Sequence, residues 1–442
     1  MAVQAQLLKG TRDFLPERML LRQFVIGKLR EVFENFGFEP IDTPAIEYAE
    51  VLEGKYGDEA DKLIYKFEDR GGRRVGLRYD LTVPLARVIG TYPDLAKPFK
   101  RYQIAPVWRA EKPQKGRYRE FWQCDVDTVG SSSMLADAEV VEVADDALRR
   151  LGFSRFKTKI NNRKVLAAVA ECVGVTPDKA VYVYRAIDKL DKIGLDGVKA
   201  ELESSGVERP VVDRLLDLLQ IRDKADAVLA QLRTKLADFS IGIEGVNELE
   251  ELVGYLRSLG MKEEYFEVDF SMVRGLEYYT GPIFETVVEE PRIGSICGGG
   301  RYDNLVRLFA NRATPATGIS LGLERIVDVL DELHLAGVPA LKTVTHALVT
   351  IFGTDTVGES LKLASELRSA DVHTEVYLGT DRLGNQLRYA SRKSIPFAII
   401  IGPDEIAQGK VVLKNMATEE QVIVERSEVT SHLLSQCDVL MR

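Results

Sequence analysis

Arginine and acidic side chains, rather than a nucleophile with a base, are the candidates for chemistry in this 442-residue sequence. No serine, cysteine or histidine stands in a pattern typical of covalent catalysis, and the histidines all lie from His334 onward, after the arginine-bearing segments. Guanidinium groups bind phosphates and carboxylates through paired hydrogen bonds, so such a set suits substrate alignment and charge neutralisation. The set comprises Asp80, Arg109, Glu111, Asp127, Arg274 and Arg325.

A basic loop lies beside the first of these arginines. The window Lys97–Arg119 holds eight Lys or Arg residues and a single acid, Glu111, although the chain carries a net charge of −9. The negative total argues against indiscriminate binding of nucleic acid. It does not exclude a local basic footprint, because binding follows the local field. We therefore expect an anionic ligand near this loop.

A glycine run in "CGGGRYDNL" (Cys297–Leu305) fits two interpretations. The first is a tight turn between strands, and the second is a backbone brought close to a ligand, beside Arg301 and Asp303. The segment is not a phosphate loop, because the required Lys-Ser/Thr pair is missing.

Two further segments have polar residues at the ends of expected strands. "RGLEYYTG" (Arg274–Gly281) carries adjacent tyrosines, which point to opposite faces of a strand. No more than one of Tyr278 and Tyr279 should then enter a given pocket unless a bulge intervenes, and an edge strand with a surface arginine is equally compatible. "GISLGLERI" (Gly318–Ile326) reads as a small-residue strand leading into a helix, whose N-terminus favours anions.

Composition indicates a folded protein of several domains, since the chain is too long for one ordinary core. No apolar run approaches the ~20 residues that span a bilayer, and the N-terminal segment lacks the apolar core of a signal peptide. We expect a cytoplasmic protein without a membrane segment. The cysteines are scattered and form no CxxC pair, which predicts neither a disulfide framework nor a metal site. They are Cys124, Cys172, Cys297 and Cys437.

The elements that must position these residues are predicted from periodicity. Residues 20–37 show helical spacing that ends at Gly37. The segment "FEPIDTPAIEY" reads as a strand interrupted by Pro44. Thr82 is a plausible cap of a later helix. "PFKRYQIAPVWRA" and "REFWQCDVDTVG" form a long antiparallel hairpin around the basic loop.

The order of these elements predicts an α+β architecture. Residues 1–163 and 261–333 would form one antiparallel-sheet domain, with a helical insertion at 164–260. Residues 334–344 would be a linker. Strands alternate with helices in 345–442, which predicts a small α/β domain with at least one parallel pair.

Taken together, the segments resemble class II aminoacyl-tRNA synthetases, and specifically the histidyl-tRNA synthetase family. "TPAIEY" resembles the first motif of that class, residues 108–127 the second with its loop, and "GISLGLERI" the third. The family-specific signals are "LKGTRDFLP", "LRYDLT", "VRGLEYYTGPIFE" and "GGRYD", in the expected order. The C-terminal part is similar to the anticodon-binding domain of the same family, so the resemblance covers essentially the whole chain.

The resemblance implies that L-histidine is activated with ATP to histidyl-adenylate and pyrophosphate, and that histidine is then transferred to the 3′ end of tRNA(His). It also implies Mg²⁺ with the ATP and a homodimer formed through the first motif. Arg109 and Arg274 would be catalytic, flanking the α-phosphate. Histidine would be bound by Asp80, Thr82, Arg109, Gln123, Asp127, Arg274, Tyr278 and Tyr279. ATP would be bound by Arg109, Glu111 and Arg325. The tRNA would be bound by Gln114, Lys115, Arg117, Arg382, Arg388 and Arg392.

Departures from the family pattern are small. Glu277 replaces a common aspartate, Asp127 stands where some members have glutamate, and "LGNQ" (383–386) replaces a more basic segment, which bears on the anticodon contacts.

Two other interpretations remain. A regulatory relative of the family lacks the C-terminal domain and erodes the arginine motifs, whereas both are kept here. A histidine-sensing module of a kinase would need a kinase segment, and the sequence has none.

Overall fold

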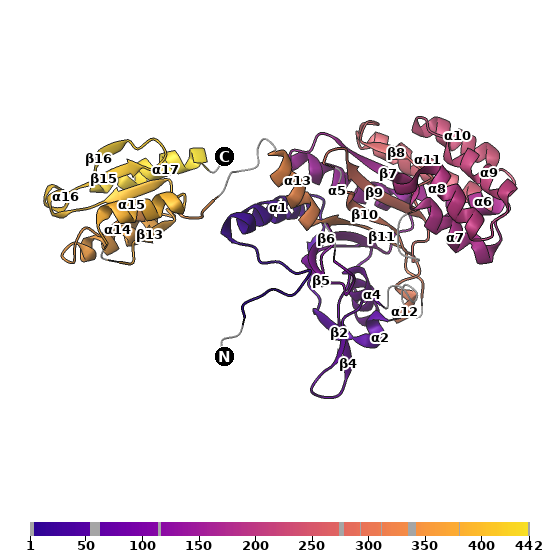
Figure 1. The fold of residues 1–442 in the computed structure, drawn as a ribbon, viewed down its shortest axis with the longest axis horizontal. Helices are drawn as coiled ribbons and strands as arrows, with labels where there is room; N and C mark the ends of the chain where they lie inside the picture. The colour runs from indigo at the N-terminus through magenta and orange to yellow at the C-terminus, as the bar shows by residue number, and fades with distance from the viewer. Residues whose placement is uncertain are drawn as a thin grey trace. The chain divides into compact units, whose positions relative to one another are not determined.

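The hairpin around the basic loop lies within the larger sheet, next to its edge strand β1 (Glu39–Pro40), in the computed structural model (Figure 1). Strands β5 (Phe99–Trp108) and β6 (Glu120–Val129) pair antiparallel along their whole length. The expected hairpin is therefore confirmed. The structure describes residues 4–53, 62–113, 116–273, 278–291, 293–310, 312–334, 342–379 and 381–440.

The larger sheet joins segments that lie far apart in the sequence. Its strand order is β1-β5-β6-β11-β10-β9-β7-β8, and the pairs are antiparallel except β1 with β5 and β7 with β8. The second edge of β6 thus pairs with β11, far downstream. This sheet confirms the predicted fold class. Its other strands are β1 (Glu39–Pro40), β7 (Phe156–Asn162), β8 (Phe266–Val268), β9 (Pro282–Val288), β10 (Ser295–Arg301) and β11 (Ala316–Gly322).

Helices pack on the middle strands of this sheet. Helices α5 (Met134–Arg150) and α13 (Leu323–Leu333) contact β6 and β11. The cap of α5 is Ser133, whose hydroxyl accepts a hydrogen bond from a backbone N–H of the first turn. Helix α1 (Pro16–Asn35) begins at a proline and stops before Gly37, whose φ of +73° confirms the expected stop.

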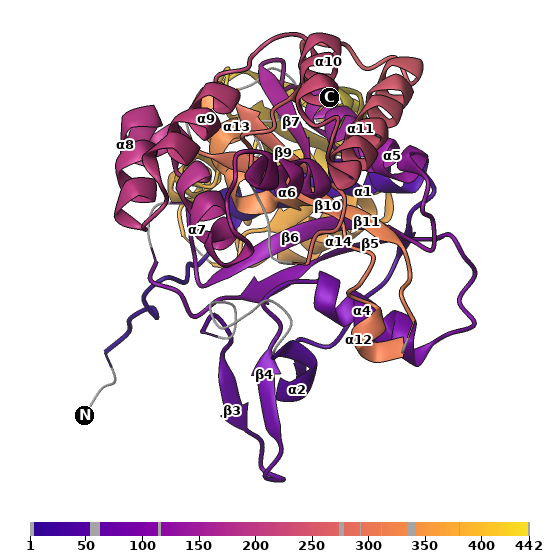
Figure 2. The ribbon, with the colours of Figure 1, turned by 90° about the vertical axis from the view of Figure 1, so that its right-hand side faces the viewer.

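A group of helices lies between β7 and β8 in the sequence, as the helical pattern predicts. In Figures 1 and 2 these helices gather beside β7 and β8. Their apolar sides form a core of leucine and valine, while Lys, Arg and Glu face outward. The helices are α6 (Arg163–Cys172), α7 (Pro177–Ile187), α8 (Leu190–Ser204), α9 (Arg209–Leu219), α10 (Ala225–Lys235) and α11 (Ser240–Ser258).

The segment around Pro44 differs from the prediction of one interrupted strand. It forms β1 of the larger sheet and, after a turn, β2 (Ile46–Tyr48) of a small separate sheet. Proline lacks an N–H for a ladder, and the Asp42 carboxylate accepts from the backbone N–H of Thr43, which stabilises a turn here. The rest of this lobe, which projects from unit 1 in Figure 2, is β3 (Lys66–Glu68), β4 (Arg74–Leu77) and α2 (Ala49–Leu52).

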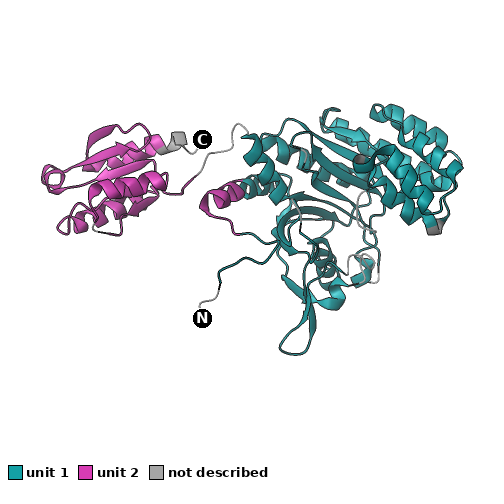
Figure 3. Cartoon of the chain, viewed as in Figure 1, with its two compact units in different colours: residues 1–12, 25–336 teal, residues 13–24, 337–442 magenta. Residues whose placement is uncertain are grey.

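The chain divides into two compact units, drawn in different colours in Figure 3. Unit 1 comprises residues 1–12 and 25–336, and unit 2 comprises residues 13–24 and 337–442. The sheet of unit 2 has the order β13-β12-β14-β15-β16, in which β12 is parallel to both β13 and β14. The predicted parallel pair is confirmed, whereas β16 and the helices after it were not predicted.

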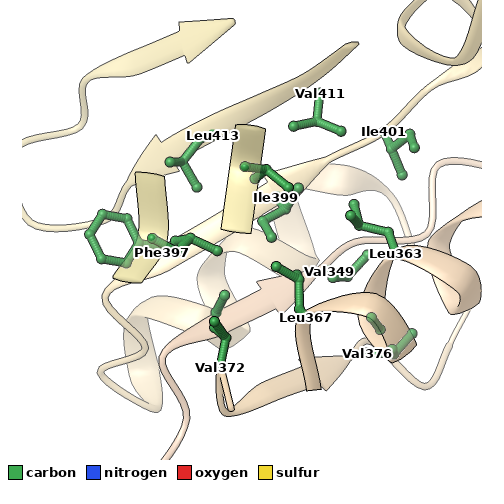
Figure 4. Close-up of a cluster of buried hydrophobic side chains, with 14 of the residues drawn as sticks. Val349, Leu363, Leu367, Val372, Val376, Phe397, Ile399, Ile401, Val411 and Leu413 are labelled. Atoms are coloured by element: carbon green, nitrogen blue, oxygen red, sulfur yellow. The ribbon is translucent and has the colours of Figure 1, made fainter. Parts of the chain in front are cut away.

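Unit 2 has a hydrophobic core of its own. Figure 4 shows side chains of the sheet, such as Val349 and Ile399, facing Leu363 and Leu367 of α14. All are at most 1% exposed. The elements of this unit are β12 (Ala347–Val349), α14 (Val357–Ser369), β13 (Thr374–Val376), α15 (Leu383–Arg392), β14 (Phe397–Ile400), α16 (Pro403–Gln408), β15 (Lys410–Asn415), β16 (Gln421–Glu425), a 3₁₀ turn (Arg426–Glu428) and α17 (Val429–Leu440).

In the described part of the chain, no helix combines the length and the apolar character needed to cross a membrane. Cys124, Cys172 and Cys297 are free thiols. The expected linker falls largely on residues 335–341, which lie outside the described residues.

Candidate active site

A cavity of about 440 Å³ opens in unit 1 between β6, β10, β11 and the start of α4 (Thr82–Thr91). It collects most of the residues that the sequence analysis selected from separate segments. The selected residues that line it are Asp80, Thr82, Arg109, Glu111, Arg117, Gln123, Asp127, Tyr278, Tyr279 and Arg325. Gln114, Lys115 and Arg274 lie outside the described residues.

The start of α4 forms one wall of this cavity, and its capping differs from the prediction. Thr82 is the first residue of the helix rather than its cap. The Asp80 carboxylate instead accepts from the backbone N–H of Val83 at 3.1 Å, which satisfies a donor of the first turn. Because the Asp80 carboxylate caps the helix, the Thr82 hydroxyl can bind a ligand in the cavity. Asp80 is only 3% exposed, so the carboxylate is fixed where a cationic ligand group would bind.

One face of β6 forms the floor of the cavity. Side chains alternate along a strand, so Gln123, Asp125 and Asp127 point to the same side. Arg101 lies opposite Asp127 on β5, and its Nη2 is 2.6 Å from the Asp127 Oδ2. The Tyr302 hydroxyl donates to Asp127 Oδ1. The Asp127 carboxylate is therefore held in one orientation before any ligand binds.

The floor is acidic and buried: Asp125 is 2% and Asp127 is 3% exposed. Burial raises the pKa of Asp125 to about 7, although Arg101 lowers it. Burial likewise raises the pKa of Asp127 against the effect of Arg101, and the pKa of Tyr302 lies well above its ordinary value because that ring is buried beside Asp127. Two carboxyl groups thus share one guanidinium, an arrangement that favours a cationic ligand group.

Glycines bring the strands of this floor unusually close together. A Cβ on Gly318 would lie 2.0 Å from Asp127 Oδ1, and a Cβ on Gly299 would lie 2.0 Å from the Gly318 carbonyl oxygen. The glycine run is therefore neither a turn nor a loop: it lies inside β10. The interpretation as a tight turn is wrong, and close backbone packing beside the cavity is the reason for these glycines.

The two adjacent tyrosines also differ from the prediction. Both Tyr278 and Tyr279 line the cavity, with ring centroids 4.4 Å apart. Alternation between faces does not apply, because the described residues 278–281 precede β9 and are not in a strand. The Tyr278 ring packs edge-on against Tyr302 at 5.7 Å, and its hydroxyl donates to that of Tyr279 at 3.3 Å.

Arginines form the opposite, cationic part of the cavity. Arg109 Nε donates to the Tyr79 carbonyl oxygen at 3.1 Å, which fixes the guanidinium close to the Phe121 ring. Arg325, in the first turn of α13, donates to the carbonyl oxygen of Ser295. One end of the cavity thus suits an anion, while the β6 floor suits a cation.

Glu111 and Arg117 lie in the loop between β5 and β6. The Glu111 carboxylate is 3.8 Å from Arg117 Nη1, and Arg117 is half exposed. Their position at the cavity connects the basic loop to the site.

A family model described as Histidyl-tRNA synthetase matches residues 10–326. The chain belongs to the histidyl-tRNA synthetase family. A second model, described as Anticodon binding domain, matches residues 346–436, within unit 2.

Relatives match this histidyl-tRNA synthetase family chain over nearly its full length. The Histidine--tRNA ligase of Cytophaga hutchinsonii is 43% identical, with 96% of this chain and 98% of the relative aligned. That of Rhodopirellula baltica is 45% identical, with 95% of each chain aligned. The crystal structure of histidyl-tRNA synthetase from Nostoc sp. has a TM-score of 0.86 at 32% identity and covers 98% of this chain and 100% of its own.

Several residues of this synthetase-family site were missed by the sequence analysis. Asp125 could have been found, because it lies two residues from both Gln123 and Asp127 and so shares their face. Tyr302 stands within the quoted "GGRYD" signal. Arg101 and the ion pair between Arg12 and Glu324, at 2.9 Å, depend on contacts between distant segments that periodicity does not reveal.

The remaining selected arginines lie in unit 2. Arg382 is the cap residue of α15, and Arg388 and Arg392 lie one turn apart on that helix. All are exposed. Lys393, which the sequence groups with them, forms an ion pair with Glu375 of β13. Among the described residues of this helix, the exposed basic face therefore consists mainly of the three arginines.

Proposed function

We propose that the protein is a histidine–tRNA ligase. In the first reaction, a carboxylate oxygen of L-histidine attacks the α-phosphorus of ATP, and pyrophosphate leaves. In the second, a terminal hydroxyl of tRNA(His) attacks the histidyl carbonyl carbon, and AMP leaves. The observation that carries the proposal is that, in a chain of this family, one cavity combines a cationic end with an acidic floor.

The cationic end suits the first reaction. Negative charge develops on the phosphate oxygens during attack, so guanidinium groups fixed beforehand lower the barrier. We assign the α-phosphate to Arg109, which its hydrogen bond to Tyr79 already orients, and the far end of the triphosphate to Arg325. Glu111 would contact adenine. Arg274 would complete the clamp on the α-phosphate, as the family resemblance implies.

The acidic floor suits the amino acid. We assign the α-ammonium group to Asp80, Thr82 and Gln123, which lie at the cavity wall. A neutral imidazole has one donor and one acceptor, and a carboxylate with a tyrosine hydroxyl can satisfy both. Asp127, with Tyr278 or Tyr279, would form these hydrogen bonds with the imidazole ring. A site that keeps such polar groups dry rejects an apolar side chain by ~10⁴-fold or more.

Mg²⁺ would arrive with the nucleotide. The described residues contain no cluster of His, Cys, Asp or Glu side chains that could form a protein cage for a metal ion. Mg²⁺ is commonly held by substrate phosphates and water with little help from side chains. The residues present therefore offer no dedicated site, and no step is assigned to the ion.

The tRNA would contact both units. The basic loop with Gln114, Lys115 and Arg117 would meet the acceptor end, because Arg117 lies at the cavity. Arg382, Arg388 and Arg392 would meet the anticodon region. We accordingly assign residues 1–163 and 261–333 to adenylate formation, and residues 345–442 to anticodon binding, in a cytoplasmic enzyme.

A homodimer would form through the small sheet of unit 1. Ile46 and Tyr48 of β2 and Phe67 of β3 are 45–49% exposed. Tyr48 and Phe67 both pair with Val75 of β4, so these apolar side chains share one face of the sheet. A second copy would cover this face. Sedimentation at micromolar concentration checks the state, and a dimer that Tyr48→Glu converts to a monomer would support the assignment.

Amino-acid-dependent exchange of pyrophosphate into ATP tests the proposed function directly. We expect histidine, and none of the other nineteen amino acids at equal concentration, to support exchange. Charging of tRNA(His) should follow in the same preparation. Exchange with a different amino acid, or none with histidine, would contradict the proposal, while exchange without charging would indicate a protein that has lost the second reaction.

A further inference from the structure

The segment that precedes α1 packs on the basic loop between β5 and β6. The backbone N–H of Arg119 donates to the Gly10 carbonyl oxygen at 2.8 Å, and Arg119 Nη1 donates to that of Lys9 at 3.2 Å. Arg119 Nε also donates to the Glu111 carbonyl oxygen at 3.2 Å, at the other end of the loop. A Cβ on Gly10 would lie 3.0 Å from Pro113 Cβ. The segment is therefore in close contact with both ends of the loop.

Arg12 continues this contact into the cavity wall. Its guanidinium carbon lies 3.4 Å from the centroid of the Tyr118 ring, and its Nη2 donates to Glu324 Oε2 at 2.9 Å. Glu324 is 5% exposed in the first turn of α13, and its Oε1 accepts from the backbone N–H of Trp122 at 3.2 Å. Tyr118 and Glu324 line the cavity, whereas Arg12 does not. A fixed carboxylate thus holds the guanidinium, and the guanidinium covers the ring.

These contacts lie at the cationic end of the cavity. Arg325 directly follows Glu324 on α13, and its Nε donates to the carbonyl oxygen of Gly116, in the same loop segment as Tyr118, at 3.4 Å. The proposed function assigns Arg325 to the triphosphate. Asp127, which it assigns to the imidazole, lies toward the end of β6 that is distant from the loop. A change in the Tyr118 ring should therefore affect ATP rather than histidine.

We propose that Arg12 is a positioning residue for ATP, which holds the Tyr118 ring in place at the cationic end of the cavity before the nucleotide binds. This inference rests on the proposed function. A tyrosine side chain turns about two torsions, and a ligand that packs against a loose ring must order it on binding. Because a guanidinium is attracted to the face of an aromatic ring, and Glu324 fixes this guanidinium, the ring is ordered during folding instead.

The first test compares Arg12→Ala with the wild-type chain by histidine-dependent exchange of pyrophosphate into ATP. Without the guanidinium, ATP must order the ring itself, so we expect the KM for ATP to rise about 5–10-fold. The KM for histidine and kcat should each change by less than about twofold, because the histidine groups and the phosphate clamp are untouched. A wild-type KM for ATP, or an equal rise in both KM values, would contradict the proposal.

Arg12→Lys separates the shape of the group from its charge. An ammonium group can still pair with Glu324, but it lacks the planar face that covers the Tyr118 ring. The KM for ATP should therefore lie between those of the wild type and Arg12→Ala. Full recovery would mean that a positive charge near the triphosphate is sufficient, which would overturn the proposal. Because this variant keeps the ion pair, it also tests the proposal if Arg12→Ala folds poorly.

Arg149→Ala is the matched control. The Arg149 guanidinium carbon lies 3.8 Å from the centroid of the Tyr265 ring, and its Nε donates to the Asp145 carboxylate at 2.6 Å. None of these three residues lines the cavity. Each variant loses one stacked guanidinium and one ion pair, so both melting temperatures should fall. Only Arg12→Ala should raise the KM for ATP, and the same rise in Arg149→Ala would show that lowered stability alone explains it.

A second test asks whether Arg12 acts through Tyr118. Tyr118→Leu removes the ring and should raise the KM for ATP at least as much as Arg12→Ala does. Adding Arg12→Ala to it should change the KM by less than about twofold, because residues in contact that act together are not additive. Multiplying effects in the double variant would mean that Arg12 acts on ATP by another route, and they would overturn the proposal.

The same measurements separate this inference from the proposed function. If the wild-type chain supports no histidine-dependent exchange, the proposed function fails. If the wild type is active and both Arg12→Ala and Arg12→Lys keep the wild-type KM for ATP, only the present inference fails.

Discussion

The buried carboxyl group of Asp125 has a consequence for stability at the scale of the residue. Its pKa is about 7 in the folded chain and near 3.8 when exposed, so the folded state binds the proton more tightly. Stability must then decrease as the pH rises from about 4 to 7, because the folded state loses a proton that the unfolded state has already lost. The ionised form of this buried carboxyl group is therefore tolerated at some cost in stability.

Asp125→Asn should raise the melting temperature at pH 8, where it removes a buried charge, by ~2–4 °C for each kcal/mol gained. At pH 5 the wild-type group is already neutral, so the difference should nearly vanish. Calorimetry at the two pH values measures it. A variant that melts lower than the wild type at pH 8 would show that the ionised group is stabilised by its neighbours rather than tolerated.

At the scale of elements, the close packing of β6, β10 and β11 makes Gly318 indispensable. A methyl group there would displace the Asp127 carboxylate, which lies 2.0 Å from the added Cβ. Misplacement of a substrate-binding group by about 1 Å can cost on the order of 10²-fold in rate. Gly318→Ala should therefore lower kcat/KM for histidine by about that factor in the exchange reaction.

Gly254→Ala provides the control for this substitution. Gly254 lies within α11, where an added Cβ meets nothing within 4 Å. Alanine favours a helix, so this variant should keep full activity and gain a little stability. Wild-type kinetics in Gly318→Ala would mean that the strands separate easily and that the glycine is not required by Asp127.

The elements also show where sequence reasoning succeeds. The β5–β6 hairpin and the insertion helices were predictable because their signals are local: alternation, amphipathic spacing and a short basic loop that contains Pro113 and Gly116. The glycine run was not, because the need for glycine comes from β11, a strand distant in the sequence. The prediction for the tyrosine pair was wrong for a related reason: the alternation of side chains along a strand was applied to residues that precede β9.

The candidate site was predictable only in part. Its arginines and acids were selected by residue type and its other residues through the family resemblance, and the described ones meet in one cavity. Their partners were not selected: Arg101 reaches Asp127 across the hairpin, and Tyr302 reaches it from beyond β10. Such contacts follow from the register of three strands, which a single sequence does not specify.

At the scale of the whole molecule, the proposed function places both reactions in unit 1 and anticodon binding in unit 2. Replacing Arg382, Arg388 and Arg392 together by alanine should leave histidine-dependent exchange unchanged, because the cavity lies wholly in unit 1. The KM for tRNA in charging should rise at least ~10-fold, and each lost phosphate contact should reduce the salt dependence of binding by about one unit of slope.

Lys362→Ala is the control for the arginine variant. Lys362 is an exposed cation on α14 of the same unit, and it already pairs with Glu359 at 2.8 Å. Charging should be unaffected by its loss. An arginine variant that charges tRNA with wild-type kinetics would remove α15 from the tRNA interface.

The pairing of β6 with β11 also sets the order in which the protein can be made. During synthesis the β5–β6 hairpin emerges early and can form at once, since its strands are neighbours in the chain. The opposite edge of β6 must wait until the insertion helices and β11 have been translated. The nascent chain therefore exposes an open edge of β6 throughout the synthesis of the segment between Val129 and Ala316, and the cavity of unit 1 can be completed only after β11 has left the ribosome.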